Sequence, residues 1–132
     1  MAEIELAEVF LAKAEESLAG EQSELVNGRY NNCANRCYYA CFQGAVASLM
    51  REGIDPPGSQ WGHEFVQSQF VGQLINRRKR YPADLRDVLE RLYDLRHVAD
   101  YRGARVSATL AVRALRRARG FVQAIQGRGG SA

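Results

Sequence analysis

Apolar residues recur every three or four positions along most of the chain, which is the spacing of one face of an α-helix. A first stripe covers residues 3 to 19 and stops before Gly20, so we expect the first helix to end there. A second stripe runs from about residue 27 to residue 51 and is broken by the turn-forming segment GIDPPGS. The apolar positions of these two helices are Ile4, Ala7, Leu11, Ala14, Leu18, Tyr30, Ala34, Cys37, Tyr38, Cys41, Ala45 and Leu49.

The next segment, from about residue 59 to residue 77, has a less regular pattern. Its large apolar side chains are spread around the helix rather than gathered on one face. They are Trp61, Phe65, Phe70, Leu74 and Ile75. A helix that is apolar on several sides is either deeply buried or shared with a partner subunit.

Two further helices are expected in the last third of the chain. Pro82 fits the first turn of a fourth helix, because its missing N–H has no intrahelical partner there. The segment DYRGAR forms the following loop, and Ser107 is the expected N-cap of a fifth helix that ends at Gly127. The core positions of these helices are Leu85, Val88, Leu89, Leu92, Leu95, Ala99, Leu110, Ala114, Ala118, Phe121, Val122 and Ile125.

No segment alternates with period two for long enough to predict a strand. We therefore expect an all-α fold, an up-and-down bundle of four to five helices with short connections. The length of 132 residues fits a single domain over residues 1–127, followed by a flexible tail over residues 128–132.

Composition places the chain among cytoplasmic globular proteins. It is 46% hydrophobic and 25% charged, and no apolar run approaches the roughly 18 residues of a membrane span. The N-terminal segment MAEIELAEVF is acidic and amphipathic, unlike a secretory signal. Cys33, Cys37 and Cys41 fall on one predicted helix, without a nearby His or Asp in the sequence to complete a ligand set, so we interpret them as packing residues and expect neither a metal nor a cofactor.

The net charge of +3 is unevenly distributed. Basic residues cluster in NRRKR (76–80) and RALRRAR (113–119), whereas the first helix is acidic. Nucleic acid or a nucleotide is one interpretation of these basic surfaces, and an arginine-rich solvated helix face is the other.

Arg96 lies in the apolar sector of the fourth helix, where a charge without partners is costly. Asn31 and Asn35 fall on the apolar side of the second helix, so their carbonyls and a tyrosine hydroxyl are candidate partners. Such a network either fixes the packing of the bundle or lines a pocket for a phosphate or another anion. Arg36 and Tyr39, on the flank of the second helix, either reach the same cleft or are exposed.

Three segments together resemble the HEPN (higher eukaryotes and prokaryotes nucleotide-binding) domain family. They are GRYNNCANRCYYACFQGAVASLM (28–50), LYDLRHVADYRG (92–103) and VSATLAVRALRRARGFVQAI (106–125). The similarity is greatest to small stand-alone prokaryotic members with an LRxxADY-like motif. It implies a helical bundle, a homodimer, and operation beside a minimal nucleotidyltransferase as a toxin and antitoxin pair.

Many members of this family are metal-independent ribonucleases with an arginine, a polar residue after it, and a histidine four to six residues further on. Arg96 matches the arginine and His97 the polar residue, but Tyr101 stands at the histidine position. Tyrosine, with a pKa of about 10, is a poorer proton shuttle at neutral pH than imidazole at about 6.5. The resemblance thus implies a cleft around Arg96 that binds RNA or a nucleotide phosphate. A weak ribonuclease and a purely structural or adaptor dimer are the alternatives.

The candidate residues for these roles are few. The candidate catalytic residues are Arg96, His97 and Tyr101, and the candidate ligand-binding residues are Asn31, Asn35, Arg36, Tyr39, Asp100 and Arg102. His63, one of only two histidines, is interpreted as a helix-start or surface residue.

Overall fold

The computed structural model describes the backbone of residues 2–101 and 106–130 and the side chains of residues 6–97 and 106–127. Its elements are α1 (Ala2–Val26), α2 (Tyr30–Arg51), α3 (His63–Gln69), the π-helix η1 (Phe70–Arg77), the 3-10 helix η2 (Ala83–Leu85), α4 (Val88–Tyr101) and α5 (Ala108–Gly130). No strand occurs in the described backbone, so the predicted all-α class is confirmed.

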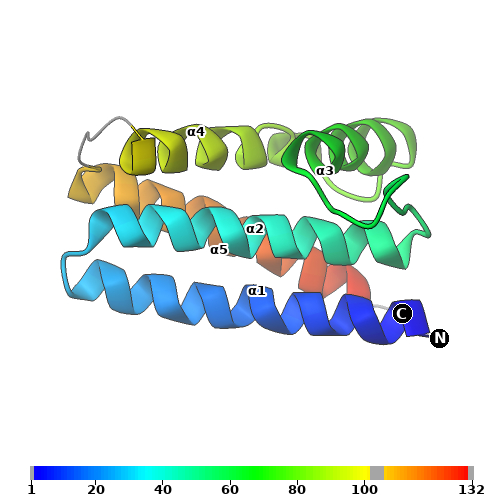
Figure 1. Ribbon diagram of the computed structural model, residues 1–132, viewed down its shortest axis with the longest axis horizontal. Coiled ribbons are helices and arrows are strands. Elements are labelled where there is room, and N and C mark those ends of the chain that lie inside the picture. Colours follow the sequence, from blue (N-terminus) through cyan, green and yellow to red (C-terminus); the bar gives the residue numbers. More distant parts are fainter. Residues whose placement is uncertain (1, 102–105, 131–132) are drawn as a thin grey trace.

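Helix α2 is the central helix of the bundle. It runs antiparallel to α1, with α4 on its other side and α5 crossing behind (Figure 1). Its buried face consists mainly of small residues, which allow the neighbouring helices to approach closely. They are Cys33, Ala34, Cys37, Ala40, Cys41, Gly44, Ala45, Ala47 and Ser48. The burial of all three cysteines confirms their role as packing residues.

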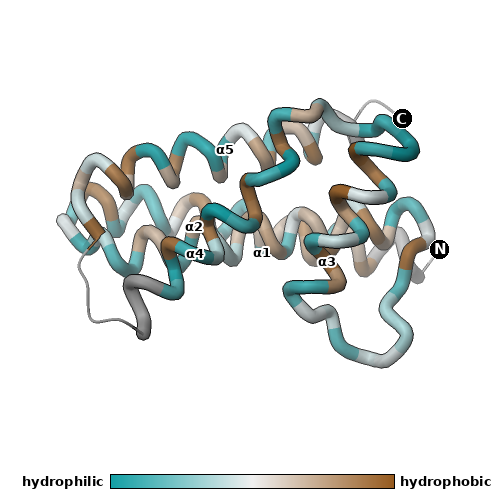
Figure 2. Tube along the Cα trace, turned by 90° about the horizontal axis from the view of Figure 1, so that it is seen from above, coloured by the Kyte–Doolittle hydropathy of each residue, from teal (hydrophilic) through white to brown (hydrophobic). Residues whose placement is uncertain are grey.

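The remaining helices contribute larger side chains to the same core. Hydrophobic positions recur along α5 and alternate with hydrophilic ones (Figure 2). The ring of Phe121 from α5 meets that of Phe70 from η1 at a centroid distance of 4.9 Å. Phe70 also stacks on Tyr81, at 5.3 Å. These contacts attach the segment that follows α2 to the bundle.

Helix η1 explains the second half of the irregular apolar pattern of residues 59 to 77. In a π-helix the hydrogen bonds link residues five apart, so the helical repeat is longer than in an α-helix. Phe70, Leu74 and Ile75 are therefore all buried in one core despite their irregular spacing. The predicted helix also begins later than expected, at His63.

Several predicted helix ends were wrong. Helix α1 continues through Gly20 to Val26, and α5 continues past Gly127 to Gly130, into the predicted tail. Pro82 is in an extended conformation before η2 and not in the first turn of α4. Ser107, by contrast, is the N-cap of α5 as predicted, because its Oγ accepts a hydrogen bond from the Leu110 N–H at 3.2 Å.

Candidate functional site

Arg96 is half-buried on α4 and its guanidinium faces α2. Its Nε donates a hydrogen bond to Asn35 Oδ1 at 2.8 Å, and one Nη donates to the Tyr39 hydroxyl at 3.2 Å. The guanidinium also lies over the rings of Tyr38 and Tyr39, 5.4 and 5.1 Å from their centroids. The expected partnership with an asparagine carbonyl and a tyrosine hydroxyl is therefore present, and it joins α4 to α2.

Asn31 has a partner outside the Arg96 network, and its predicted ligand-binding role stays a prediction. Its Oδ1 accepts a hydrogen bond from the backbone N–H of Val106 at 2.8 Å. This bond fixes the chain just before α5 begins and ties it to the start of α2.

Asn35, Arg36 and Tyr39 come together at a polar hollow of about 390 Å³ between α1 and α2. Its other lining residues are Ser17, Asn32 and Gln43. We refer to these six residues as the polar hollow. Because Asn35 and Tyr39 are also the partners of Arg96, the hollow borders the Arg96 network.

Hydrogen-bond donors predominate in the polar hollow. Asn35 Oδ1 is occupied by Arg96, and Gln43 Oε1 accepts from Ser17 Oγ at 3.3 Å, so both side chains keep their amide N–H groups for other partners. Asn32 is oriented the other way, because its Nδ2 donates to Glu24 at 3.4 Å and leaves Oδ1 as an acceptor. Arg36 has no ion pair among the side chains that the structure describes. The hollow is therefore positively charged and suited to a ligand rich in acceptors.

Gly20 makes room for Arg36. A Cβ atom built at Gly20 would lie 2.7 Å from an Nη atom of Arg36, so the guanidinium lies across α1 at the point where this helix has no side chain. The glycine that seemed to end the first helix is instead a site of close approach between α1 and α2.

The other predicted site residues are less well placed by the structure. His97 is exposed, and its ring centroid is 6.0 Å from that of Tyr93. The side chains of Asp100 and Tyr101, and the whole of Arg102, lie outside the described residues. Their predicted roles beside Arg96 stay predictions.

His63 is the first residue of α3, as the helix-start interpretation predicted, but it is half-buried and its ring has partners on two other helices. Its Nδ1 is 2.9 Å from the Tyr38 hydroxyl, its Nε2 is 2.8 Å from Glu90 Oε1, and its ring stacks on Tyr93 at a centroid distance of 3.9 Å. Burial raises the pKa of Tyr38 above its ordinary value, although Arg96 acts in the opposite direction, so this hydroxyl stays protonated. The chain Tyr38–His63–Glu90 therefore connects α2, α3 and α4.

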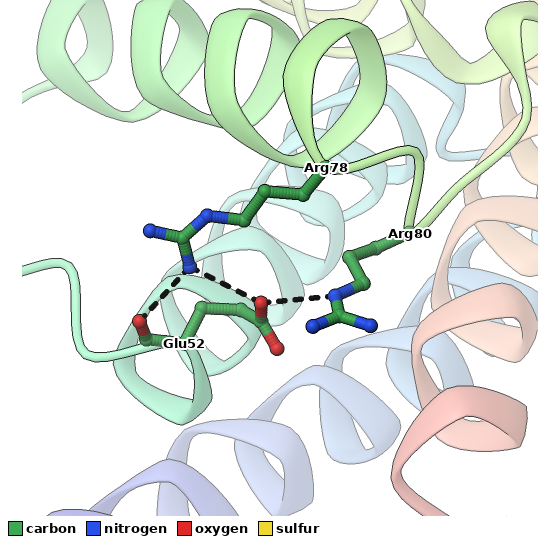
Figure 3. A network of polar contacts seen from close by, with 3 residues as sticks. All are labelled: Glu52, Arg78 and Arg80. Atoms are coloured by element: carbon green, nitrogen blue, oxygen red, sulfur yellow. Dashed lines mark hydrogen bonds and ion pairs between the residues drawn. The ribbon is translucent and has the colours of Figure 1, made fainter.

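Part of the basic sequence NRRKR has a structural role. Arg78 donates to the backbone carbonyl and the carboxylate of Glu52, at 3.1 and 3.2 Å, and Arg80 donates to the same carboxylate at 3.1 Å (Figure 3). Glu52 is the residue after α2, so these ion pairs attach the end of η1 to the end of α2. They reduce the positive charge that this surface offers to a partner.

The second basic cluster is more exposed. Arg113, Arg116 and Arg117 on α5 face solvent, and the first two line a pocket of about 410 Å³. A pocket of about 560 Å³ lies at the starts of α2 and α5 and includes Arg29, which is paired with Glu24 at 2.7 Å. Neither pocket brings the predicted ligand-binding residues together as the polar hollow does.

Glu21 is a buried carboxyl group on α1, and Cys33 and Cys37 of α2 and Arg119 of α5 affect its ionisation. Burial raises its pKa to about 8, and the opposing effects of the Cys37 thiol and the Arg119 guanidinium are smaller. Neither carboxyl oxygen has an N–H or O–H partner in the described part of the chain. Among those same residues, no group of three or more His, Cys, Asp or Glu side chains is arranged to hold a metal ion.

The sequence contained a readable signal for most of the polar hollow. Asn32, Asn35, Tyr39 and Gln43 are spaced by three or four residues and form a polar stripe on α2. Asn32 and Gln43 were not predicted, because they lie outside the apolar stripe of α2 on which the predicted partners of Arg96 were based. Ser17 could not be found in this way, because it is on another helix.

The family comparison agrees with the sequence resemblance. None of the described helices is both long enough and apolar enough to span a membrane. No curated protein matches the chain significantly. The family model for the HEPN domain matches residues 7–128, nearly the whole of the sequence. The chain therefore belongs to the HEPN domain family.

Proposed function

We propose that this HEPN domain binds a phosphate group of RNA or of a nucleotide in the polar hollow beside Arg96. The observation that carries the proposal is the hollow itself, where Arg36 and the amide N–H groups of Asn35 and Gln43 have no acceptor among the described residues. Phosphate oxygens are acceptors only, and arginine binds them through its planar fork of N–H groups.

Arg36→Gln tests this site, and Arg116→Gln is the matched control because it removes the same charge from the exposed face of α5. The ligand is a short end-labelled RNA, titrated at one stated salt concentration in EDTA, since phosphate binding depends steeply on salt. Loss of a charge-assisted hydrogen bond should weaken binding about tenfold or more for Arg36→Gln and much less for Arg116→Gln. The reverse order would place the RNA on the arginines of α5 and contradict the proposal.

The same samples also show whether the protein cleaves the labelled RNA. A weak ribonuclease activity that uses Arg96, His97 and Tyr101 would release labelled fragments in EDTA, and Arg96→Ala would abolish them without abolishing the fold. If Arg96 is only structural, Arg96→Ala lowers the free energy of unfolding and leaves the affinity of the protein for RNA unchanged. The homodimer, the nucleotidyltransferase partner and the role in a toxin and antitoxin pair remain predictions. Co-purification of the two proteins would test the partnership.

A further inference from the structure

The polar hollow is larger than a phosphate group requires. Its volume of about 390 Å³ falls within the range of small-molecule sites, which is about 300 to 1,000 Å³. A phosphate has only five heavy atoms, so the space beside it would admit a nucleobase.

Tyr39 offers such a base a surface on which to stack. Its side chain lines the hollow, and the residue is 40% exposed although it is aromatic. Arg96 lies 5.1 Å from the ring centroid, and Tyr38 packs against it edge-on at 5.5 Å, so the ring is held in place. A fixed, exposed aromatic ring stacks with bases of any identity.

The identity of the base would be read by two asparagines of the hollow. Asn32 and Asn35 are three residues apart and therefore neighbours on one face of α2. Asn35 presents amide N–H donors, because its oxygen accepts from Arg96. Asn32 presents its oxygen, because its amide donates to Glu24. A donor beside an acceptor is complementary to a carbonyl beside a ring N–H.

We infer that the polar hollow is a nucleobase site that selects the keto bases, guanine and uracil, over adenine and cytosine. Guanine and uracil both carry a carbonyl next to a ring N–H, whereas adenine and cytosine carry an amino group next to an unprotonated ring nitrogen. Their amino groups would face the Asn35 donors, and their ring nitrogens would face the Asn32 oxygen. Unpaired polar groups of this kind are what makes a site reject a close analogue. The inference rests on the proposed phosphate site.

The test is isothermal titration of the full chain with GMP, UMP, AMP, CMP and ribose 5-phosphate at one salt concentration. All five ligands carry the same phosphate and differ in the base. We expect GMP and UMP to bind about tenfold or more tightly than AMP, CMP and ribose 5-phosphate. Tyr39→Leu should bring GMP and UMP close to ribose 5-phosphate, whereas Tyr39→Phe, which keeps the ring, should retain most of the difference. Thermal melts of both variants verify that they are folded.

The outcomes separate the two proposals. Equal binding of all five ligands, reduced by Arg36→Gln, would overturn base recognition and leave the phosphate site intact. A preference for AMP or CMP would also overturn it. If ribose 5-phosphate and all four nucleotides fail to bind, both proposals are wrong.

Discussion

The charge of Arg96 is accommodated by side chains of α2. Two N–H groups of the guanidinium donate to Asn35 and Tyr39, and its π-system lies against the rings of Tyr38 and Tyr39. A cation that is partly withdrawn from water is tolerable when hydrogen bonds and aromatic faces replace its hydration. This arrangement lets a polar residue sit in the apolar sector of α4 and still border the polar hollow.

Gly20→Ala should change the position of the Arg36 side chain without lowering the stability of the fold. Alanine in a helix interior is more favourable than glycine by about 0.5 to 1 kcal/mol, so we expect stability to be unchanged or slightly raised. The new methyl carbon would lie only 2.7 Å from the present position of an Nη of Arg36, which is too close, and would displace that flexible end from α1. RNA binding should therefore weaken while the urea midpoint does not fall. Gly72→Ala, where a Cβ meets nothing within 4 Å, is the control for alanine substitution alone.

If Gly20→Ala binds RNA as tightly as the parent chain, the position of Arg36 along α1 does not matter for the ligand. If the urea midpoint falls well below that of the parent, the contact between α1 and α2 is too tight for Arg36 to move aside.

At the scale of the elements, the chain Tyr38–His63–Glu90 attaches α3 to α2 and α4. Tyr38→Phe removes one hydroxyl and leaves Nδ1 of the half-buried His63 without its partner, so we expect a loss of about 1 to 3 kcal/mol in the free energy of unfolding. Tyr93→Phe is the matched control, because it preserves the ring that stacks on His63. Urea unfolding of both variants gives the comparison, and equal losses would mean that the Tyr38 hydroxyl does not hold α3.

Helix faces could be predicted from the sequence, but several helix ends and the tertiary partners could not. The apolar stripes of α2 and α5 depend only on local periodicity, and most of their residues are buried as expected. Leu110 is an exception, because it was predicted as a core residue of α5 and is exposed in the first turn of that helix. Gly20 and Gly127 looked like helix ends, because glycine is favoured there, but both helices continue past them. At Gly20, packing against α2 overrides the local preference. The partners of His63 lie 25 and 27 residues away along the chain, a distance over which periodicity carries no information.

The same distinction applies to the candidate site. Asn35 was predicted as a partner of Arg96 because both fall on apolar helix faces, and the helices meet there. Asn31 falls on the same face but lies in the first turn of α2, where it accepts a hydrogen bond from the backbone N–H of Val106, just before α5. The helix face on which a side chain lies can thus be predicted from the local sequence. The group that the side chain contacts depends on how the whole bundle packs.

At the scale of the whole molecule, Glu21 makes stability depend on pH. Its pKa is about 8 in the folded chain and about 4.5 in the unfolded chain. Below the lower value both states hold the proton, and between the two values only the folded state does. The stabilisation from this proton is therefore complete at acidic pH and is lost as the pH rises through about 8, at no more than about 1.4 kcal/mol per pH unit.

Glu21→Gln replaces the carboxyl group with an amide that does not ionise. Its stability relative to the parent chain should rise between about pH 5 and pH 8 and then level off, because only the parent has to bury a group that loses its proton. Urea unfolding of both proteins across this range measures the difference, and other titrating groups cancel because the two proteins share them. Glu16→Gln, at an exposed position of α1, is the control for replacing a carboxyl group of this helix with an amide. A flat difference for Glu21→Gln would mean that Arg119 or water reaches the carboxylate and that Glu21 is ionised in the folded core.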